Sequence, residues 1–214
     1  MNKVVIKQIL KSITHELAEE QDYLVELDGK MGDGDLGLTM VKGFNSLYDE
    51  VDYIVADDLG TILLRLGMKM NTTVPSTMGS LISICLLKSA AVVKGKTTCS
   101  LADMARMGRA ALDGVMERGQ AQVGEKTMLD ALHPAVVILE SFASQGKEAD
   151  EALPLAYQAA KDGMERTKHL VSIHGRAGYY KEKTLGMPDA GAVAVTLIFK
   201  GICLALFSEE NIFQ

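Results

Sequence analysis

The chain has 214 residues, of which 48% are apolar and 23% are charged, a composition typical of a folded globular protein rather than a disordered one. Its 22 Lys and Arg against 28 Asp and Glu give a net charge of −6. The overall field therefore repels a nucleic-acid backbone, and we expect no nucleic-acid partner.

Several other classes of protein are also disfavoured. The three cysteines, Cys85, Cys99 and Cys203, form no Cys-x-x-Cys pair, which argues against a disulfide framework and a zinc cage. The N-terminal residues lack an apolar stretch followed by a cleavage site, and the longest uncharged run, 70–87, is rich in hydroxyl side chains. We expect a cytoplasmic protein with no membrane span.

Apolar residues recur at helical spacing along most of the chain. The spacing predicts a first amphipathic helix carrying Val5, Ile6, Ile9, Leu10, Ile13 and Leu17 on one face. It predicts seven further helices near 38–49, 59–70, 79–93, 101–118, 129–142, 152–169 and 191–207.

The boundary of the 101–118 helix has a specific signal, because Ser100 and Asp103 have the spacing of a capping box. No segment alternates apolar and polar residues for long, and aromatic residues make up only 5%. No linker or repeat divides the chain. These features predict an all-α fold, a helical bundle or barrel, formed as one domain over residues 1–214.

Glycine and short polar residues gather in four segments that separate predicted helices: 28–37, 72–79, 119–126 and 175–191. Loops that meet at one end of a helical array can build a site. The 28–37 segment carries Asp28, Asp33 and Asp35, which repel one another unless a cation lies between them. Such oxygen ligands suit Mg²⁺ or Ca²⁺.

Two alternatives apply to this acidic segment. An EF-hand needs a glutamate at its twelfth position, and counting from Asp28 that residue is Thr39. A solvated turn is the other alternative. The segment leads directly into a predicted helix, however, whose N-terminus suits a phosphate group.

The other three segments offer groups for an anion or a nucleotide. Ser76 and Thr77 precede an apolar helix and form either an anion cradle or a simple helix cap. Lys126 could contact phosphate while Met128 packs against a flat ring, unless this stretch is a surface loop capped by Thr127. Arg176, flanked by glycines, could grip phosphate with two hydrogen bonds or form a surface ion pair.

In this order, the motifs resemble those of the nucleotide-binding L subunit of dihydroxyacetone kinase over almost the whole chain. The motifs are Leu27-Asp28, Gly32-Asp33-Gly34-Asp35-x-Gly37, Arg118-Gly119-x-Ala121, Gly124-Glu125-Lys126-Thr127-Met128-x-Asp130, Gly175-Arg176-Ala177-x-Tyr179, Glu182-Lys183-Thr184-x-Gly186 and Asp189-x-Gly191.

The resemblance implies an antiparallel eight-helix barrel that holds a nucleotide, ADP or ATP, and two Mg²⁺ ions at one end. It implies Asp28, Asp33 and Asp35 as the catalytic residues and metal ligands. Together with the loop chemistry it gives these candidate nucleotide contacts: Leu36, Gly37, Leu38, Thr39, Ser76, Thr77, Met78, Gly119, Met128, Arg176, Asp189, Ala190 and Gly191.

The resemblance also implies phosphoryl transfer to dihydroxyacetone or a related short ketose held on a partner K subunit. In the phosphotransferase-dependent systems, ADP stays bound and a phosphocarrier subunit recharges it. We expect this type rather than ATP dependence, and a homodimer. A nucleotide-loaded regulatory subunit without turnover and a helical interaction module are the alternatives.

Two departures from the family pattern favour a divergent paralogue. Leu36 stands where the family commonly has histidine, and Pro75-Ser76-Thr77-Met78-Gly79 stands where it commonly has Gly-Gly-Ala-Ser-Gly. The first removes a hydrogen-bond donor, and the second restricts the close backbone approach that glycine allows.

Overall fold

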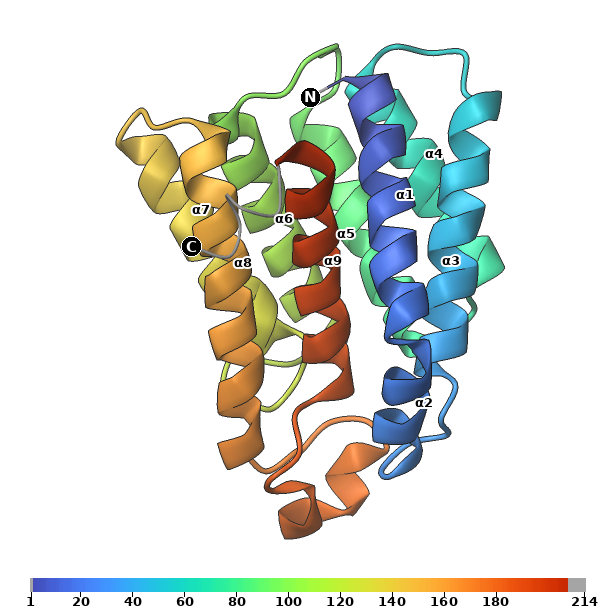
Figure 1. The fold of residues 1–214 in the computed structure, drawn as a ribbon, viewed down its shortest axis with the longest axis vertical. Helices are drawn as coiled ribbons and strands as arrows, with labels where there is room; N and C mark the ends of the chain where they lie inside the picture. Colours follow the sequence, from blue (N-terminus) through green and yellow to red (C-terminus); the bar gives the residue numbers. More distant parts are fainter. Residues whose placement is uncertain (1, 208–214) are drawn as a thin grey trace.

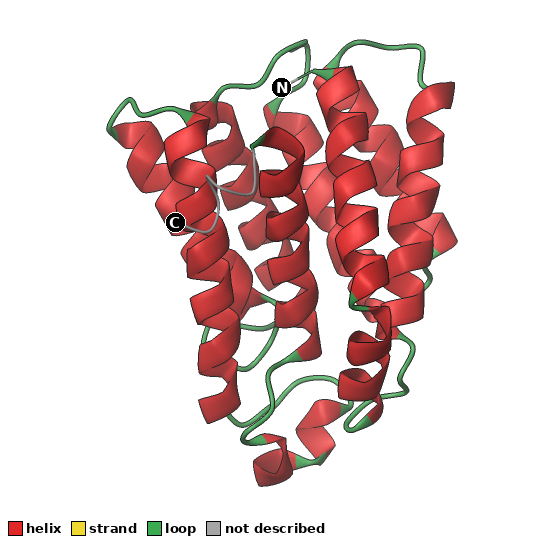
Figure 2. Ribbon diagram, in the orientation of Figure 1, coloured by secondary structure: helices red, strands yellow, loops and turns green. Residues whose placement is uncertain are grey.

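Nine α-helices make up most of residues 2–207, the part of the chain that this computed structural model describes. They are α1 Lys3–Glu19, α2 Gln21–Gly29, α3 Leu36–Glu50, α4 Leu59–Thr73, α5 Thr77–Val92, α6 Leu101–Gly119, α7 Leu129–Ser144, α8 Ala149–Arg166 and α9 Ala190–Leu206. Four short 3₁₀ helices are η1 Val51–Tyr53, η2 Thr167–His169, η3 Ala177–Tyr179 and η4 Lys181–Thr184. Residues 2–207 contain no strand (Figure 2), so the all-α prediction is confirmed.

The eight predicted helices are all present, with ends that differ from the predicted ones by a few residues. The capping box is confirmed, because the Ser100 hydroxyl accepts from the Asp103 amide at 3.2 Å and the Asp103 carboxylate accepts from the Ser100 amide at 3.2 Å. Helix α2 was not predicted. It is a short helix that buries only Leu24 and Leu27, too few apolar positions to give a periodic signal.

Eight of the helices close into a ring. Helix α1 packs on α3, each helix from α3 to α9 packs on the next, and α9 packs back on α1. Neighbours in the ring run in opposite directions (Figure 1). The eight-helix barrel implied by the resemblance is therefore confirmed, with α2 as an additional short helix at one end.

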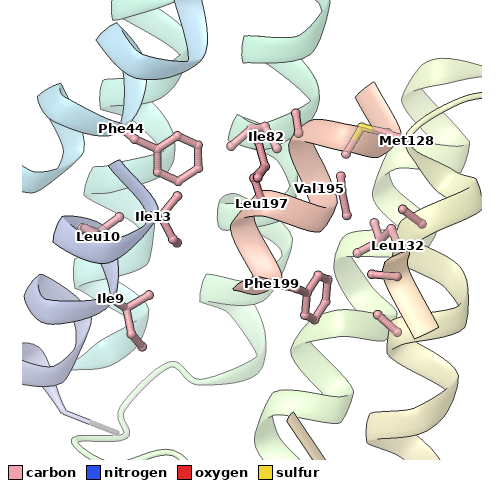
Figure 3. Close-up of a cluster of buried hydrophobic side chains, with 14 of the residues drawn as sticks. Ile9, Leu10, Ile13, Phe44, Ile82, Met128, Leu132, Val195, Leu197 and Phe199 are labelled. Carbon is pink, nitrogen blue, oxygen red and sulfur yellow. The ribbon is translucent and has the colours of Figure 1, made fainter. Parts of the chain in front are cut away.

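Helix α9 supplies much of the core. Val195, Leu197 and Phe199 lie in the cluster that also includes Ile13 and Ile82 from facing helices (Figure 3). The close packing of α9 on α1 depends on Gly201, since a Cβ there would lie 2.6 Å from the Cα of Ile13. None of the helices described for residues 2–207 is long and apolar enough to cross a bilayer.

The alternating helix directions decide where the loops meet. The segments after α2, α4, α6 and α8 all lie at the lower end of the barrel in Figure 1, and the connections after α3, α5 and α7 lie at the upper end. The four segments singled out by composition are therefore at one end of the molecule.

Candidate functional site

The acidic loop after α2 is folded around Asp28. The Asp28 carbonyl accepts from the Met31 amide at 3.0 Å, and its carboxylate accepts from the Asp35 amide at 3.1 Å and the Leu36 amide at 3.4 Å. Gly32 is needed because the Asp28 side chain occupies the place of a Cβ. These contacts turn the loop back on itself and direct it into α3.

Folding of this loop gathers the three predicted metal ligands. One carboxylate oxygen from each of Asp28, Asp33 and Asp35 can be chosen so that all lie within 4.8 Å of one another. Burial, followed by repulsion from Asp33 and Asp28, raises the pKa of Asp35, and Arg176 opposes this shift. The donor set is all oxygen and its repulsion would be relieved by a cation, so it fits Mg²⁺.

Arg176 brings the segment between α8 and α9 over this cluster. Its guanidinium lies 2.7 Å from a carboxylate oxygen of Asp33. A cavity of about 470 Å³ opens beside the pair, lined by Met31, Gly32, Arg176, Tyr179, Tyr180 and Lys183. The surface ion pair considered for Arg176 exists, but its acidic partner belongs to the candidate metal cluster.

The second segment forms a helix cap. The Ser76 hydroxyl accepts from the Gly79 amide at 3.1 Å at the start of α5, and Thr77 and Met78 are the first helical residues. The capping alternative is thus confirmed for Ser76. The N-terminus of α5 lies at the same end of the barrel as the acidic loop. A nucleotide contact by Ser76, Thr77 or Met78 therefore stays a prediction.

Met128 and the start of α9 lie together. A Cβ on Gly191 would be 3.4 Å from the Cβ of the buried Met128. Asp189 caps α9 by accepting from the Ala192 amide at 2.8 Å, and burial raises the pKa of this carboxyl to about 7. Ala190 is the first residue of α9. Gly119 ends α6 at the same end of the barrel, so these predicted contacts share one region.

At the start of α3, several of the predicted nucleotide contacts are buried or already bonded within the chain. Leu36 is buried in the core, and its amide already donates to Asp28. The space next to Gly37 is filled by the Gln21 carbonyl of α2, whereas Leu38 is exposed. The Thr39 hydroxyl donates to the Leu36 carbonyl at 3.1 Å. Nucleotide contacts by these four residues stay predictions.

One interpretation of the third segment is wrong. Lys126 does not reach toward a phosphate position, because it is only 2% exposed and its ammonium donates to backbone carbonyls of the chain itself. The neighbouring Glu125 lies 2.6 Å from His174, an interaction that no sequence motif indicated. Tyr180, in the cavity lining, was likewise not singled out, and Lys183 was named only as part of a motif, with no role.

Comparisons with known proteins show which proteins this chain is similar to. A family model described as the DAK2 domain matches residues 30–204. The chain is 32% identical over 186 residues to the Escherichia coli protein named PEP-dependent dihydroxyacetone kinase, ADP-binding subunit DhaL, covering 87% of this chain and 89% of that protein. It is 30% identical over 196 residues to a Listeria innocua protein named as the ADP-binding subunit DhaL of PEP-dependent dihydroxyacetone kinase 2, covering 90% and 89%.

A solved structure is also similar. The dihydroxyacetone kinase of C. freundii, crystallised in complex with AMP-PNP and Mg²⁺, matches with a TM-score of 0.70 and 26% identity. The match covers 92% of this chain and 33% of that kinase, so the chain spans about a third of the length of the larger enzyme. The family match over residues 30–204 and the 32% identity to a relative of similar length show that the chain belongs to the DAK2 domain family.

Proposed function

We propose that this protein is the nucleotide-binding subunit of a kinase that phosphorylates dihydroxyacetone or a related short ketose. The observation that carries the proposal is the placement of Arg176 over the cluster of Asp28, Asp33 and Asp35. Acidic oxygen ligands for Mg²⁺ beside a guanidinium are the groups needed to hold and neutralise a polyphosphate. The names of the Escherichia coli and Listeria relatives support ADP as the nucleotide.

Each part of the site has a role in this proposal. Asp28, Asp33 and Asp35 hold two Mg²⁺ ions, which when bound neutralise the phosphate oxygens and align the transferred group. Arg176 binds a phosphate oxygen, and the N-termini of α3, α5 and α9 supply backbone donors. Met128 packs against the base beside Gly191.

The ketose is held elsewhere in this proposal. The chain spans about a third of the C. freundii kinase, so a separate K subunit would carry the ketose site. The PEP-dependent relatives support a bound ADP that a phosphocarrier subunit recharges, rather than free ATP as the donor. The assembly would act in the cytoplasm, with this subunit as a homodimer.

Native mass spectrometry of the freshly purified chain in Mg²⁺ tests the nucleotide site. We expect one bound ADP and two Mg²⁺ per chain. A chain that stays empty after addition of ADP or ATP with Mg²⁺ would overturn the proposal.

A transfer assay then separates the kinase subunit from a regulatory one. The loaded chain is mixed with a K subunit carrying ketose and with the phosphocarrier, and ketose phosphate is measured. Turnover supports the kinase subunit. A loaded chain that transfers no phosphoryl group in the presence of competent partners would instead favour the nucleotide-loaded regulatory subunit, which the departures at Leu36 and 75–79 also favour.

A further inference from the structure

Lys126 is a buried cation with an unusual set of partners. Its ammonium donates to the carbonyls of Thr167 at 2.8 Å, Leu170 at 3.1 Å, Thr184 at 2.7 Å and Met187 at 2.7 Å. The residue is only 2% exposed, and its backbone has a positive φ of 58°. A lysine that is buried this completely normally needs compensation for its lost hydration, and here four carbonyl dipoles supply it.

The four carbonyls lie at the two ends of one segment. Thr167 and Leu170 precede the loop 171–183, and Thr184 and Met187 follow it. Arg176 lies within this loop and reaches Asp33 at 2.7 Å. The ammonium of Lys126 therefore closes the base of the loop that delivers the guanidinium to the acidic cluster.

Other hydrogen bonds also join the two ends of the loop. The Ser172 amide donates to the Thr184 hydroxyl at 3.0 Å, and the Gly186 amide donates to the Lys168 carbonyl at 2.8 Å. Each of these joins one residue to one other. An ammonium has three N–H groups, so two of the four carbonyls share one of them, and its compact shape suits converging carbonyls better than a planar guanidinium does.

The residue beside Lys126 holds the same loop nearer to its tip. Glu125 lies 2.6 Å from His174, two positions before Arg176. Adjacent residues of the 119–128 segment thus hold the loop at its base and next to the arginine. This double attachment connects the third predicted segment to the fourth.

We propose that Lys126 is a positioning residue that fastens both ends of the 171–183 loop and so holds Arg176 over Asp28, Asp33 and Asp35. The inference rests on the proposed function for its nucleotide readout, but its structural readout needs no nucleotide. Removing the ammonium takes away the one group that all four carbonyls contact, and frees the loop to move away from the cluster.

The test is a double-mutant cycle with Lys126→Met and Arg176→Ala, read by calorimetric titration of ADP in Mg²⁺. Because Lys126 acts through Arg176, we expect Lys126→Met to weaken ADP binding about tenfold, and to weaken it no further when Arg176 is already alanine. The matched control is Lys96→Met, which removes an ammonium 2.6 Å from Asp103 at the other end of the barrel and should leave ADP affinity unchanged.

Wild-type affinity in Lys126→Met, or losses that multiply in the double variant, would overturn the inference. Should Lys126→Met fail to fold, Lys126→Arg keeps the charge but cannot meet four carbonyls, and the same coupling to Arg176→Ala is expected.

Hydrogen exchange separates this inference from the proposed function. Without nucleotide, amides in 171–183 should exchange faster in Lys126→Met than in wild type. In Lys96→Met their exchange should equal that of wild type. Equal exchange would overturn the positioning role, whereas wild-type protein that binds no ADP would overturn only the proposed function.

Discussion

The guanidinium of Arg176 lies 2.7 Å from Asp33, one of three carboxylates that form the candidate metal cluster. The same acidic oxygen can therefore pair with the arginine or bind a cation. An exposed ion pair of this kind contributes little to folding stability, so its main effect is on what the site binds.

Replacing Arg176 with alanine should change two affinities in opposite directions. Binding of Mn²⁺ alone should strengthen, because the competing cation on Asp33 is removed. Binding of ADP with Mg²⁺ should weaken by about tenfold or more, because a charge-assisted hydrogen bond to phosphate is lost. Electron paramagnetic resonance measures the first and calorimetry the second; two affinities that fall together would show that Arg176 does not compete at Asp33.

Replacing Asp33 with alanine should abolish phosphoryl transfer, because it removes one of the three candidate metal ligands. The matched control is Asp57→Ala, an exposed carboxylate in the loop after η1 at the other end of the barrel. The assay measures ketose phosphate formed with the partner subunits present. Retained turnover in Asp33→Ala would exclude Asp33 from the metal site.

Metal affinity should fall as the pH is lowered. Burial and the neighbouring carboxylates raise the pKa of Asp35, so it takes up a proton at a higher pH than an ordinary aspartate and then no longer binds a cation as a carboxylate. Titration of Mn²⁺ at several acidic pH values measures this. Asp35→Asn should bind more weakly at every pH and show a flatter profile, and an unchanged slope would assign the proton to another group.

Stability should depend on pH through Asp189. Because its pKa in the folded chain is about 7, above the ordinary 3.8, the folded state keeps a proton that the unfolded state loses across this interval. The free energy of unfolding from this group therefore falls as pH rises from about 4 to 7. Asp189→Asn should remove this fall, because asparagine has no carboxyl to titrate. Its amide oxygen can still accept from the Ala192 amide, so the helix cap is kept. Urea denaturation at a series of pH values measures it.

Asp58, another N-cap aspartate, is the control for that experiment. The Thr61 hydroxyl donates to Asp58 at 2.6 Å and, with backbone donors, lowers the pKa of this carboxyl. Its stabilising effect is present above the ordinary pKa and is lost as the pH falls, so Asp58→Asn should change the profile in the opposite sense. The same change in both variants would show that the effect of Asp189→Asn arises from capping alone.

The capping box gives a prediction confined to stability. Burial raises the pKa of Asp103, but hydrogen bonds from Lys96, Ser100 and Arg106 outweigh it and hold this pKa well below its usual range. Asp103→Asn should lower the free energy of unfolding at pH 7 by about 2 kcal/mol. Urea denaturation measures the loss, and ADP affinity should not change; a change in affinity would mean that the two ends of the barrel are coupled.

Much of the fold could be predicted because helices are encoded locally. The apolar spacing of Ile6, Ile9, Leu10 and Ile13 marks a buried face without reference to any other segment. The capping box at Ser100 is likewise set by residues three positions apart. Helix α2 escaped prediction because it has only two buried positions, and its packing against α3 stabilises it instead.

The sequence by itself determined the candidate metal cluster, because Asp28, Asp33 and Asp35 lie in one short loop that turns back on the Asp28 side chain. Only the tertiary structure decided the partners of Arg176 and Lys126. A lysine at a loop is equally compatible with solvent, phosphate or burial, and the choice depends on which distant groups the folded chain brings near it. The barrel places four carbonyls around Lys126 and an aspartate beside Arg176, from segments that only folding brings together.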